Sequence, residues 1–188
     1  MPESFALFLL KCFYFMLPAY FANMAPVMVR KINLFAFSVD FNKTIVNKPI
    51  FGKNKTFRGI VFGIIFAVIT AYLQFLLHDI GFFSNISFLS YQNWLLFGFL
   101  MGFGALAGDL IKSFFKRRLG FKPGAKFIPF DQTDFVVGAL VFIILPQKTV
   151  ASAFKIPLVK AYFVINTFIL TSFSNSIRFD WFIFNLNF

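Results

Sequence analysis

The chain has 188 residues, of which 59% are hydrophobic and 13% are charged. An ordinary soluble domain carries about a quarter charged residues, so this composition argues against a soluble protein. It predicts one all-α integral membrane domain that spans residues 1–188, with no separate soluble domain beside it. The formal net charge of +11 does not predict nucleic-acid binding, because we expect the basic loops to lie against a bilayer.

Predominantly apolar runs long enough to cross a bilayer, about 17–25 residues each and with at most one charged residue apiece, predict about five transmembrane helices. In chain order they lie near residues 4–23, 59–77, 94–111, 135–152 and 156–177. The first run lacks a basic leader and a cleavage site, which predicts a retained helix. Pro146 and Lys148 interrupt the fourth run, so a re-entrant or tilted segment is the alternative there.

Glycines recur four residues apart inside the predicted helices. Such small residues let two helix backbones approach closely, which predicts helix packing at these positions. The pairs are Gly59 and Gly63, Gly98 and Gly102, and Gly104 and Gly108.

Basic residues gather in two of the predicted connections, the one between helices one and two and the one between helices three and four. By the positive-inside rule both loops face the cytoplasm, which puts the N-terminus outside and the C-terminus inside a multi-pass cell-membrane protein. Their concentrated charge favours anionic lipid or a soluble polyanion as the partner. The residues are Arg30, Lys31, Lys43, Lys48, Lys53, Lys55 and Arg58 in the first loop, and Lys112, Lys116, Arg117, Arg118, Lys122 and Lys126 in the second.

Three acids, Asp109, Asp131 and Asp134, lie at the predicted cytoplasmic ends of helices three and four. On a helix the spacing of Asp131 and Asp134 puts both carboxylates on one face, with Cβ atoms about 5–6 Å apart. That arrangement suits one hard cation or a pair. The alternative is that Asp131 caps the fourth helix and Asp134 favours its dipole.

The acids and the cations meet at one predicted membrane face, although the run Lys116–Arg118 by itself is typical of a positive-inside anchor. Carboxylates for Mg²⁺ together with cations for phosphate oxygens indicate a metal and polyphosphate site. The single histidine, His78, is predicted at the opposite face, which argues against serine–histidine or cysteine–histidine catalysis.

These residues also carry a resemblance. The chain resembles the CTP-dependent phosphatidate cytidylyltransferases, and more closely their archaeal-type relatives, the CDP-archaeol synthases. The motifs that carry it are Pro18-Ala19-Tyr20-Phe21-Ala22-Asn23, Asp40-Phe41, the run from Gly52 to Gly59, Gly108-Asp109-Leu110 through Ser113 to Arg118, Lys122-Pro123-Gly124-Ala125 and the pair Asp131 and Asp134. Lys112 and Pro123 depart from the bacterial-type pattern, Phe57 replaces a more usual Trp, and the segment after Asn175 matches poorly.

The resemblance implies a Mg²⁺-dependent enzyme that transfers CMP from CTP to a lipid phosphate of the 2,3-di-O-geranylgeranylglyceryl phosphate type and releases pyrophosphate. A diacyl acceptor or a CTP-using polyprenol kinase is the alternative, and the sequence leaves a homodimer possible. The expected catalytic residues are Asp131, Asp134, Lys116 and Asp109, the three acids also being the expected metal ligands. The expected nucleotide-binding residues are Lys55, Thr56, Arg58, Ser113, Arg117 and Lys122.

Overall fold

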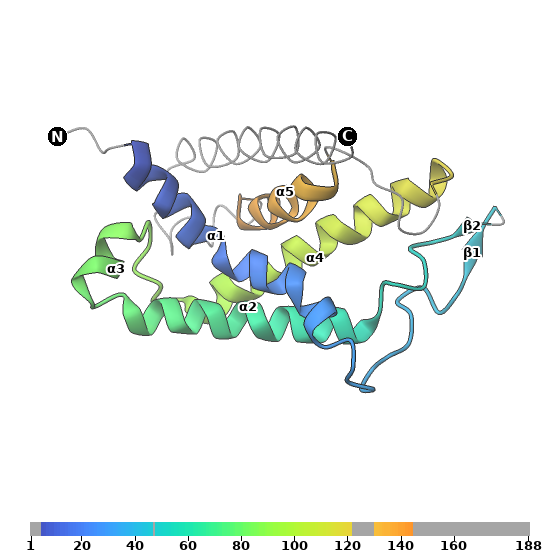
Figure 1. Ribbon diagram of the computed structural model, residues 1–188, viewed down its shortest axis with the longest axis horizontal. Helices are drawn as coiled ribbons and strands as arrows, with labels where there is room; N and C mark the ends of the chain where they lie inside the picture. The colour runs from blue at the N-terminus through green and yellow to red at the C-terminus, as the bar shows by residue number, and fades with distance from the viewer. Residues whose placement is uncertain (1–4, 47, 122–129, 145–188) are drawn as a thin grey trace, which may run out of the picture.

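The computed structural model describes residues 5–46, 48–121 and 130–144 as a bundle of packed helices with a small hairpin at one end (Figure 1). The long helices are α1 (Phe5–Met28), α2 (Phe57–Leu77) and α4 (Trp94–Arg118). The short α3 (Gly81–Ile86) lies between α2 and α4, and α5 (Phe130–Ile144), of intermediate length, follows α4. Antiparallel strands β1 (Thr44–Ile45) and β2 (Lys48–Pro49) form the hairpin, with Thr44 opposite Pro49. The hairpin lies at the same end of the bundle as the C-terminus of α4.

Within the described residues, α1, α2 and α4 are each long and apolar enough to cross a membrane. The prediction of a helical membrane protein is therefore confirmed for its first three spans. Helix α5 begins at Phe130, five residues before the predicted start at 135, and is described to Ile144. The rest of the fourth predicted span and all of the fifth lie outside the described residues.

Two helix ends were predicted wrongly. Helix α1 continues to Met28 through Pro18 and Pro26. A membrane helix tolerates such prolines because neighbouring helices can satisfy the backbone groups that a proline leaves unpaired. Helix α4 continues past residue 111 to Arg118, so Lys112 and Lys116 stand on a helix and not in a loop. Lysine and arginine are good helix formers, and cations favour the negative end of the helix dipole, so ending the helix before its first basic residue was the wrong rule.

Glycines bring the helices together, as predicted from their spacing. A Cβ added at Gly98 would lie 2.8 Å from the Cα of Val68 on α2, and one at Gly102 would press on Ala67. On the other side of α4, a Cβ at Gly104 would lie 2.8 Å from the Cα of Ala139 on α5. Backbone approaches this close leave no room for even one methyl group.

The closest approach of α4 and α5 predicts the effect of Gly138→Ala. The new Cβ would overlap the carbonyl oxygen of Gly104 and lie 2.9 Å from the Cα of Gly108, and backbone atoms cannot move aside as side chains do. We expect the free energy of unfolding to fall by about 1–3 kcal/mol or more. That corresponds to a fall in melting temperature of several degrees, at about 2–4 °C per kcal/mol for a chain of this size.

The matched control is Gly81→Ala, because a Cβ there would meet nothing within 4 Å. Both variants are compared with the parent by thermal unfolding in detergent. If Gly138→Ala unfolds at the same temperature as Gly81→Ala, the described contact between α4 and α5 is wrong.

Candidate functional site

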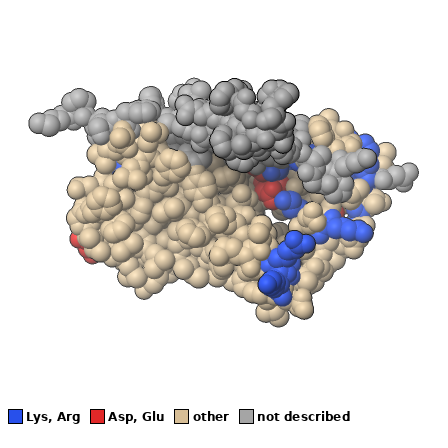
Figure 2. Space-filling model, in the orientation of Figure 1, with Lys and Arg blue, Asp and Glu red and all other residues tan. Residues whose placement is uncertain are grey.

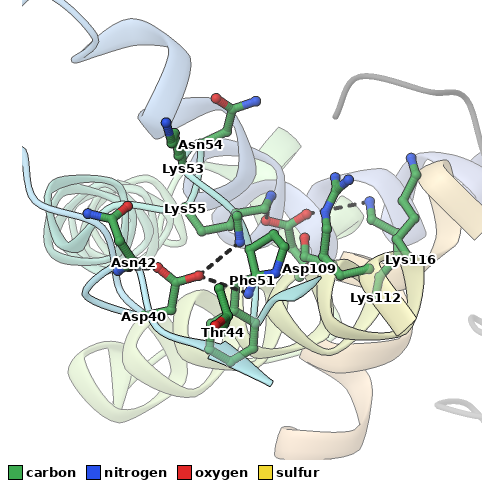
Figure 3. A pocket seen from close by; sticks show the side chains of 14 residues that line it. Asp40, Asn42, Thr44, Phe51, Lys53, Asn54, Lys55, Asp109, Lys112 and Lys116 are labelled. Atoms are coloured by element: carbon green, nitrogen blue, oxygen red, sulfur yellow. Dashed lines mark hydrogen bonds and ion pairs between the residues drawn. The ribbon is translucent and has the colours of Figure 1, made fainter. Parts of the chain in front are cut away.

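A cavity of about 570 Å³ lies between the α1–α2 connection and the last turns of α4. Figure 2 shows basic side chains gathered at this end of the molecule around a hollow in which acidic atoms are visible. Eleven of the fourteen lining residues are polar or charged, as the close view shows (Figure 3), and Pro49, Phe51 and Gly52 are the others. The connection contributes Asp40, Asn42, Thr44, Lys53, Asn54 and Lys55, and α4 contributes Asp109, Lys112, Ser113, Lys116 and Arg117.

The carboxylate of Asp40 holds the α1–α2 connection in shape. One of its oxygens accepts hydrogen bonds from the Ser38 hydroxyl and the Asn42 amide, and the other accepts from the amides of Phe51 and Gly52 at 3.1 and 3.0 Å. Burial raises the pKa of Asp40, but the four hydrogen bonds together outweigh it and lower the pKa to about 2. Gly52 adopts φ of +98°, a conformation that favours glycine.

Arg118 fastens the hairpin to the end of α4. Its guanidinium donates to the carbonyl oxygens of Ile45 at 2.6 Å, Lys48 at 3.1 Å and Pro49 at 2.8 Å. In return, the Lys48 ammonium donates to the carbonyl oxygen of Arg118 at 3.1 Å. Because Thr44 and Pro49 line the cavity, this clamp fixes one of its walls.

Alternating charges run from the connection through α4 to α5. The Lys55 ammonium pairs with one oxygen of Asp109, and the Lys112 ammonium lies 3.4 Å from the other. The same Lys112 nitrogen lies 2.7 Å from Asp134 Oδ2. All four side chains are largely buried, so each charge depends on the next for compensation.

Further along α4, three side chains extend the cationic wall. The Ser113 hydroxyl donates to the Asp109 carbonyl oxygen at 2.8 Å, while Lys116 is only 8% exposed. Arg117 donates through Nη1 to the carbonyl oxygen of Phe121 at 2.6 Å. The guanidinium is thereby held along the wall of the cavity, next to Gly52, where an added Cβ would lie 3.5 Å from its Nε.

The predicted site residues divide into four groups. Lys55, Asp109, Ser113, Lys116 and Arg117 come together around the cavity. Asp134 does not line it but reaches it through Lys112.

Thr56 and Arg58 lie outside the lining and make local contacts. The Thr56 hydroxyl accepts from the Gly59 amide at 3.3 Å and caps α2, and Arg58 donates to the carbonyl oxygen of Ile32. Their predicted role in nucleotide binding stays a prediction.

Two predicted residues are not described at the level of side chains. Lys122 lies outside the described residues, and only the backbone of Asp131 is described, in the first turn of α5. Since α5 begins at Phe130, Asp131 lies inside the helix and not before it, which disfavours the capping alternative.

Lys112 and the polar residues of the connection were missing from the predicted site. Asp40 was noted only as part of a family motif, and Asn42, Lys53 and Asn54 were not singled out as site residues. Lys112 could have been found, because it stands three residues after Asp109 and α4 continues through both. The others depend on how the connection folds back.

Comparison with known proteins places the chain among related sequences and structures. A family model described as CarS-like CDP-archaeol synthase matches residues 5–185. A CDP-archaeol synthase of Archaeoglobus fulgidus is 37% identical over 71% of this chain and 73% of its own length, and one of Thermococcus onnurineus is 38% identical over 77% and 79%. A solved structure described as an intramembrane enzyme for archaeal membrane lipid biosynthesis superposes with a TM-score of 0.63, at 25% identity, over 88% of this chain and 92% of that one.

The contacts of Asp40 predict the behaviour of Asp40→Asn. The amide would turn an NH₂ group toward amides that need an acceptor, so at least one charged hydrogen bond, worth about 1.5–3 kcal/mol, is lost. We expect amide hydrogen exchange at Phe51 and Gly52 to accelerate about tenfold to a hundredfold. In the parent, this protection should persist in mild acid and fail only as the pH falls from about 3.9, the ordinary pKa, through about 2.

Asp79→Asn is the control, because Asp79 is exposed at the other end of α2. Equal exchange rates at residues 51 and 52 in the two variants would mean that Asp40 does not hold the connection.

Proposed function

The chain belongs to the CarS-like CDP-archaeol synthase family, which confirms the resemblance, and we propose that its charged cavity is where CTP-dependent cytidylyl transfer to an archaeal lipid phosphate takes place. One observation carries the proposal. Five cations (Lys53, Lys55, Lys112, Lys116 and Arg117) and two carboxylates (Asp40 and Asp109) surround one cavity at the end of three membrane-spanning helices. That excess of positive charge suits a triphosphate meeting a lipid phosphate.

The chemistry requires little of the protein beyond charge and position. An oxygen of the lipid phosphate attacks the α-phosphorus of CTP, the bond from that phosphorus to the bridging oxygen breaks, and pyrophosphate leaves with the bonding electrons. A phosphate monoester with a second pKa near 6 is mostly dianionic at neutral pH. No general base is needed, so the location of the only histidine at the far end of α2 is no obstacle.

Repulsion between two polyanions is the main barrier, and the cations of the cavity act on it. Lys55, Lys112 and Lys116 come from two different elements and converge on one space, where they would bind phosphate oxygens of both substrates. Arg117 offers a planar fork on the same wall. Holding both reactants there makes the encounter effectively intramolecular.

The acids fit Mg²⁺. Asp134 Oδ1 is buried and has no hydrogen-bond partner among the described residues, and Asp109 lies on the other side of the Lys112 ammonium. Carboxylate oxygens of this kind are what Mg²⁺ prefers, so Asp134, Asp109 and the neighbouring Asp131 would hold it. When bound, the ion would supply positive charge to the triphosphate.

We further propose that the cavity faces the cytoplasm, where CTP is made. The basic residues of the α1–α2 connection and of the C-terminal turns of α4 lie at one end of the bundle, as Figure 2 shows, and the positive-inside rule assigns that end to the cytoplasm. The N-terminus then lies outside. Homodimerisation stays a prediction.

A direct assay tests the reaction. Purified protein with Mg²⁺, labelled CTP and a dialkylglycerol phosphate should move cytidine into the lipid phase and release pyrophosphate. A parallel assay with the diacylglycerol phosphate of equal chain length compares the reaction rates of the ether and the ester lipid. CDP as the soluble product would support a lipid kinase instead and contradict cytidylyl transfer.

The metal site predicts the effect of Asp134→Asn. We expect the Mg²⁺ concentration for half-maximal activity to rise and turnover to fall by at least about a hundredfold, as when a key electrostatic contributor is removed. Asp131→Asn should behave in the same way, and the double variant should lose less than the product of the two losses. Asp79→Asn is the control for a carboxylate outside the site.

Asp134 also pairs with Lys112, so loss of the pair must be separated from loss of the metal. A Lys112→Met, Asp134→Asn protein restores charge balance and should recover stability without recovering the Mg²⁺ response. An Asp134→Asn protein with an unchanged Mg²⁺ requirement and near-normal turnover would remove Asp134 from the metal site.

A further inference from the structure

Four aromatic rings form a continuous cluster on the outside of the α1–α2 connection. Phe37 lies at the centre, with ring centroids 5.0 Å from Phe57, 6.0 Å from Phe41 and 6.4 Å from Phe35, and Phe41 and Phe57 are 5.5 Å apart. Three of the rings remain open, with exposed fractions of 51% for Phe35, 50% for Phe37 and 63% for Phe41. We call these four residues the aromatic shelf.

Backbone hydrogen bonds hold the segments that carry the shelf. The Val39 amide donates to the Lys55 carbonyl oxygen at 2.8 Å, and the amides of Phe57 and Arg58 donate to the carbonyl oxygens of Phe37 and Phe35 at 3.1 and 2.8 Å. The first part of the connection is thereby paired with the chain that enters α2. The rings are held in place, so their exposure is not that of a loose loop.

Backbone strain accompanies this arrangement. Phe35 and Phe41 adopt φ of +50° and +48°, in the left-handed region that bulky side chains seldom enter. Strained residues of this kind persist where the surrounding structure demands them, and they gather at functional sites. Two residues of the shelf therefore combine an unfavourable backbone conformation with an exposed aromatic ring.

Exposed apolar side chains also occur at the end of α1, just before the shelf in the chain. Helix α1 ends with exposed apolar side chains at Met24, Val27 and Met28, and α2 begins at Phe57. Both helices are long enough to cross a membrane, and they pack against each other. Figure 1 shows the connection leaving the end of α1 and returning to the adjacent start of α2. The shelf thus lies where two spans leave the apolar part of the bilayer.

Exposed cations lie close to the shelf in sequence: Arg30 and Lys31 precede it, and Lys43 follows Phe41 in the same connection. Apolar rings flanked by cations match the boundary between acyl chains and anionic headgroups. A second copy of this chain is a poorer occupant, because it would bring like charges together.

The other side of the same connection forms the cavity wall. Asp40 and Asn42 line the cavity while Phe41 between them is open to the outside, and Lys55 lines it two residues before Phe57. One thin segment of chain therefore separates the charged cavity from the face that carries the shelf.

We propose that the aromatic shelf inserts into the leaflet at the level of the headgroups and sets the depth of the cavity, so that a lipid phosphate reaches the cations sideways from the bilayer. Contact with the leaflet follows from the shelf alone. Delivery of the lipid phosphate rests in addition on the proposed function.

Fluorescence quenching tests the leaflet contact without any assay of activity. In a Cys12→Ser background, the cysteine of Phe41→Cys is labelled with an environment-sensitive fluorophore, and the protein is placed in vesicles of mixed anionic and zwitterionic lipids. The lipids carry bromine either near the headgroup or near the chain ends. We expect strong quenching by bromine near the headgroup and weak quenching by bromine near the chain ends. Ile69→Cys, exposed in the middle of α2, should show the reverse, and Val46→Cys, 85% exposed at the hairpin, should show neither. A Phe41 probe as unquenched as that at Val46, or an unlabelled Phe41→Cys protein whose thiol is oxidised to a disulfide with a second copy when an oxidant is added to the vesicles, overturns the proposal.

Activity tests the consequence for the substrate. The Phe37→Ser, Phe41→Ser protein should lose about tenfold or more in kcat/KM for a long-chain lipid phosphate in vesicles, because burial of even one such ring is worth at least that factor. KM for CTP and turnover of a short-chain lipid phosphate in detergent should not change, and Leu at both positions should restore most of the loss.

Phe82→Ser is the matched control, since Phe82 has the same 63% exposure on α3 at the other end of the bundle. Equal losses on both lipids, or none in vesicles, would overturn the role in delivery. A parent protein with no transferase activity but with a quenched Phe41 probe would contradict the proposed function and leave the leaflet contact standing.

Discussion

Helices α4 and α5 approach until their backbones touch, because Gly104, Gly108 and Gly138 bring no side chains between them. An added Cβ at Gly108 would overlap the carbonyl group of Asp134. Only at that separation can the Asp134 carboxylate lie 2.7 Å from the Lys112 ammonium, in reach of the charges on α4. Glycine packing in the apolar part of the bundle thereby determines whether the ion pair at its polar end can form.

The chain of charges is self-compensated, with Lys112 between two carboxylates and Asp109 between two ammonium groups. Buried charges need such partners, and breaking a pair is costly. A bound triphosphate would offer the lysines a stronger anion, and a cation would offer the carboxylates a replacement for the lysines. If the proposed function holds, binding of nucleotide and metal together would give every buried charge a new partner, which would favour joint binding over binding of either one by itself.

How far the sequence predicts this structure depends on the range of the interactions. Spans α1, α2 and α4 follow from runs of predominantly apolar residues, and glycine packing follows from a spacing of four, since both signals are local. The end of α4 was missed because hydropathy stops at Lys112 while helix propensity does not. The fold of the connection could not be read, because Asp40 is held by residues 51 and 52 and Arg118 by residues 45, 48 and 49, contacts that no local pattern announces.

Membrane depth and cavity shape are coupled through the α1–α2 connection. Asp40 ties residues 38 and 42 to residues 51 and 52, and the pairing of Phe35 and Phe37 with the start of α2 ties the shelf to the same frame. Hydrogen-bonded backbone therefore joins the rings to Lys55 and to the cavity wall. If the leaflet holds the shelf, Lys55 and Asp109 lie at a depth that the bilayer sets, and a lipid phosphate already lies at that depth before it binds.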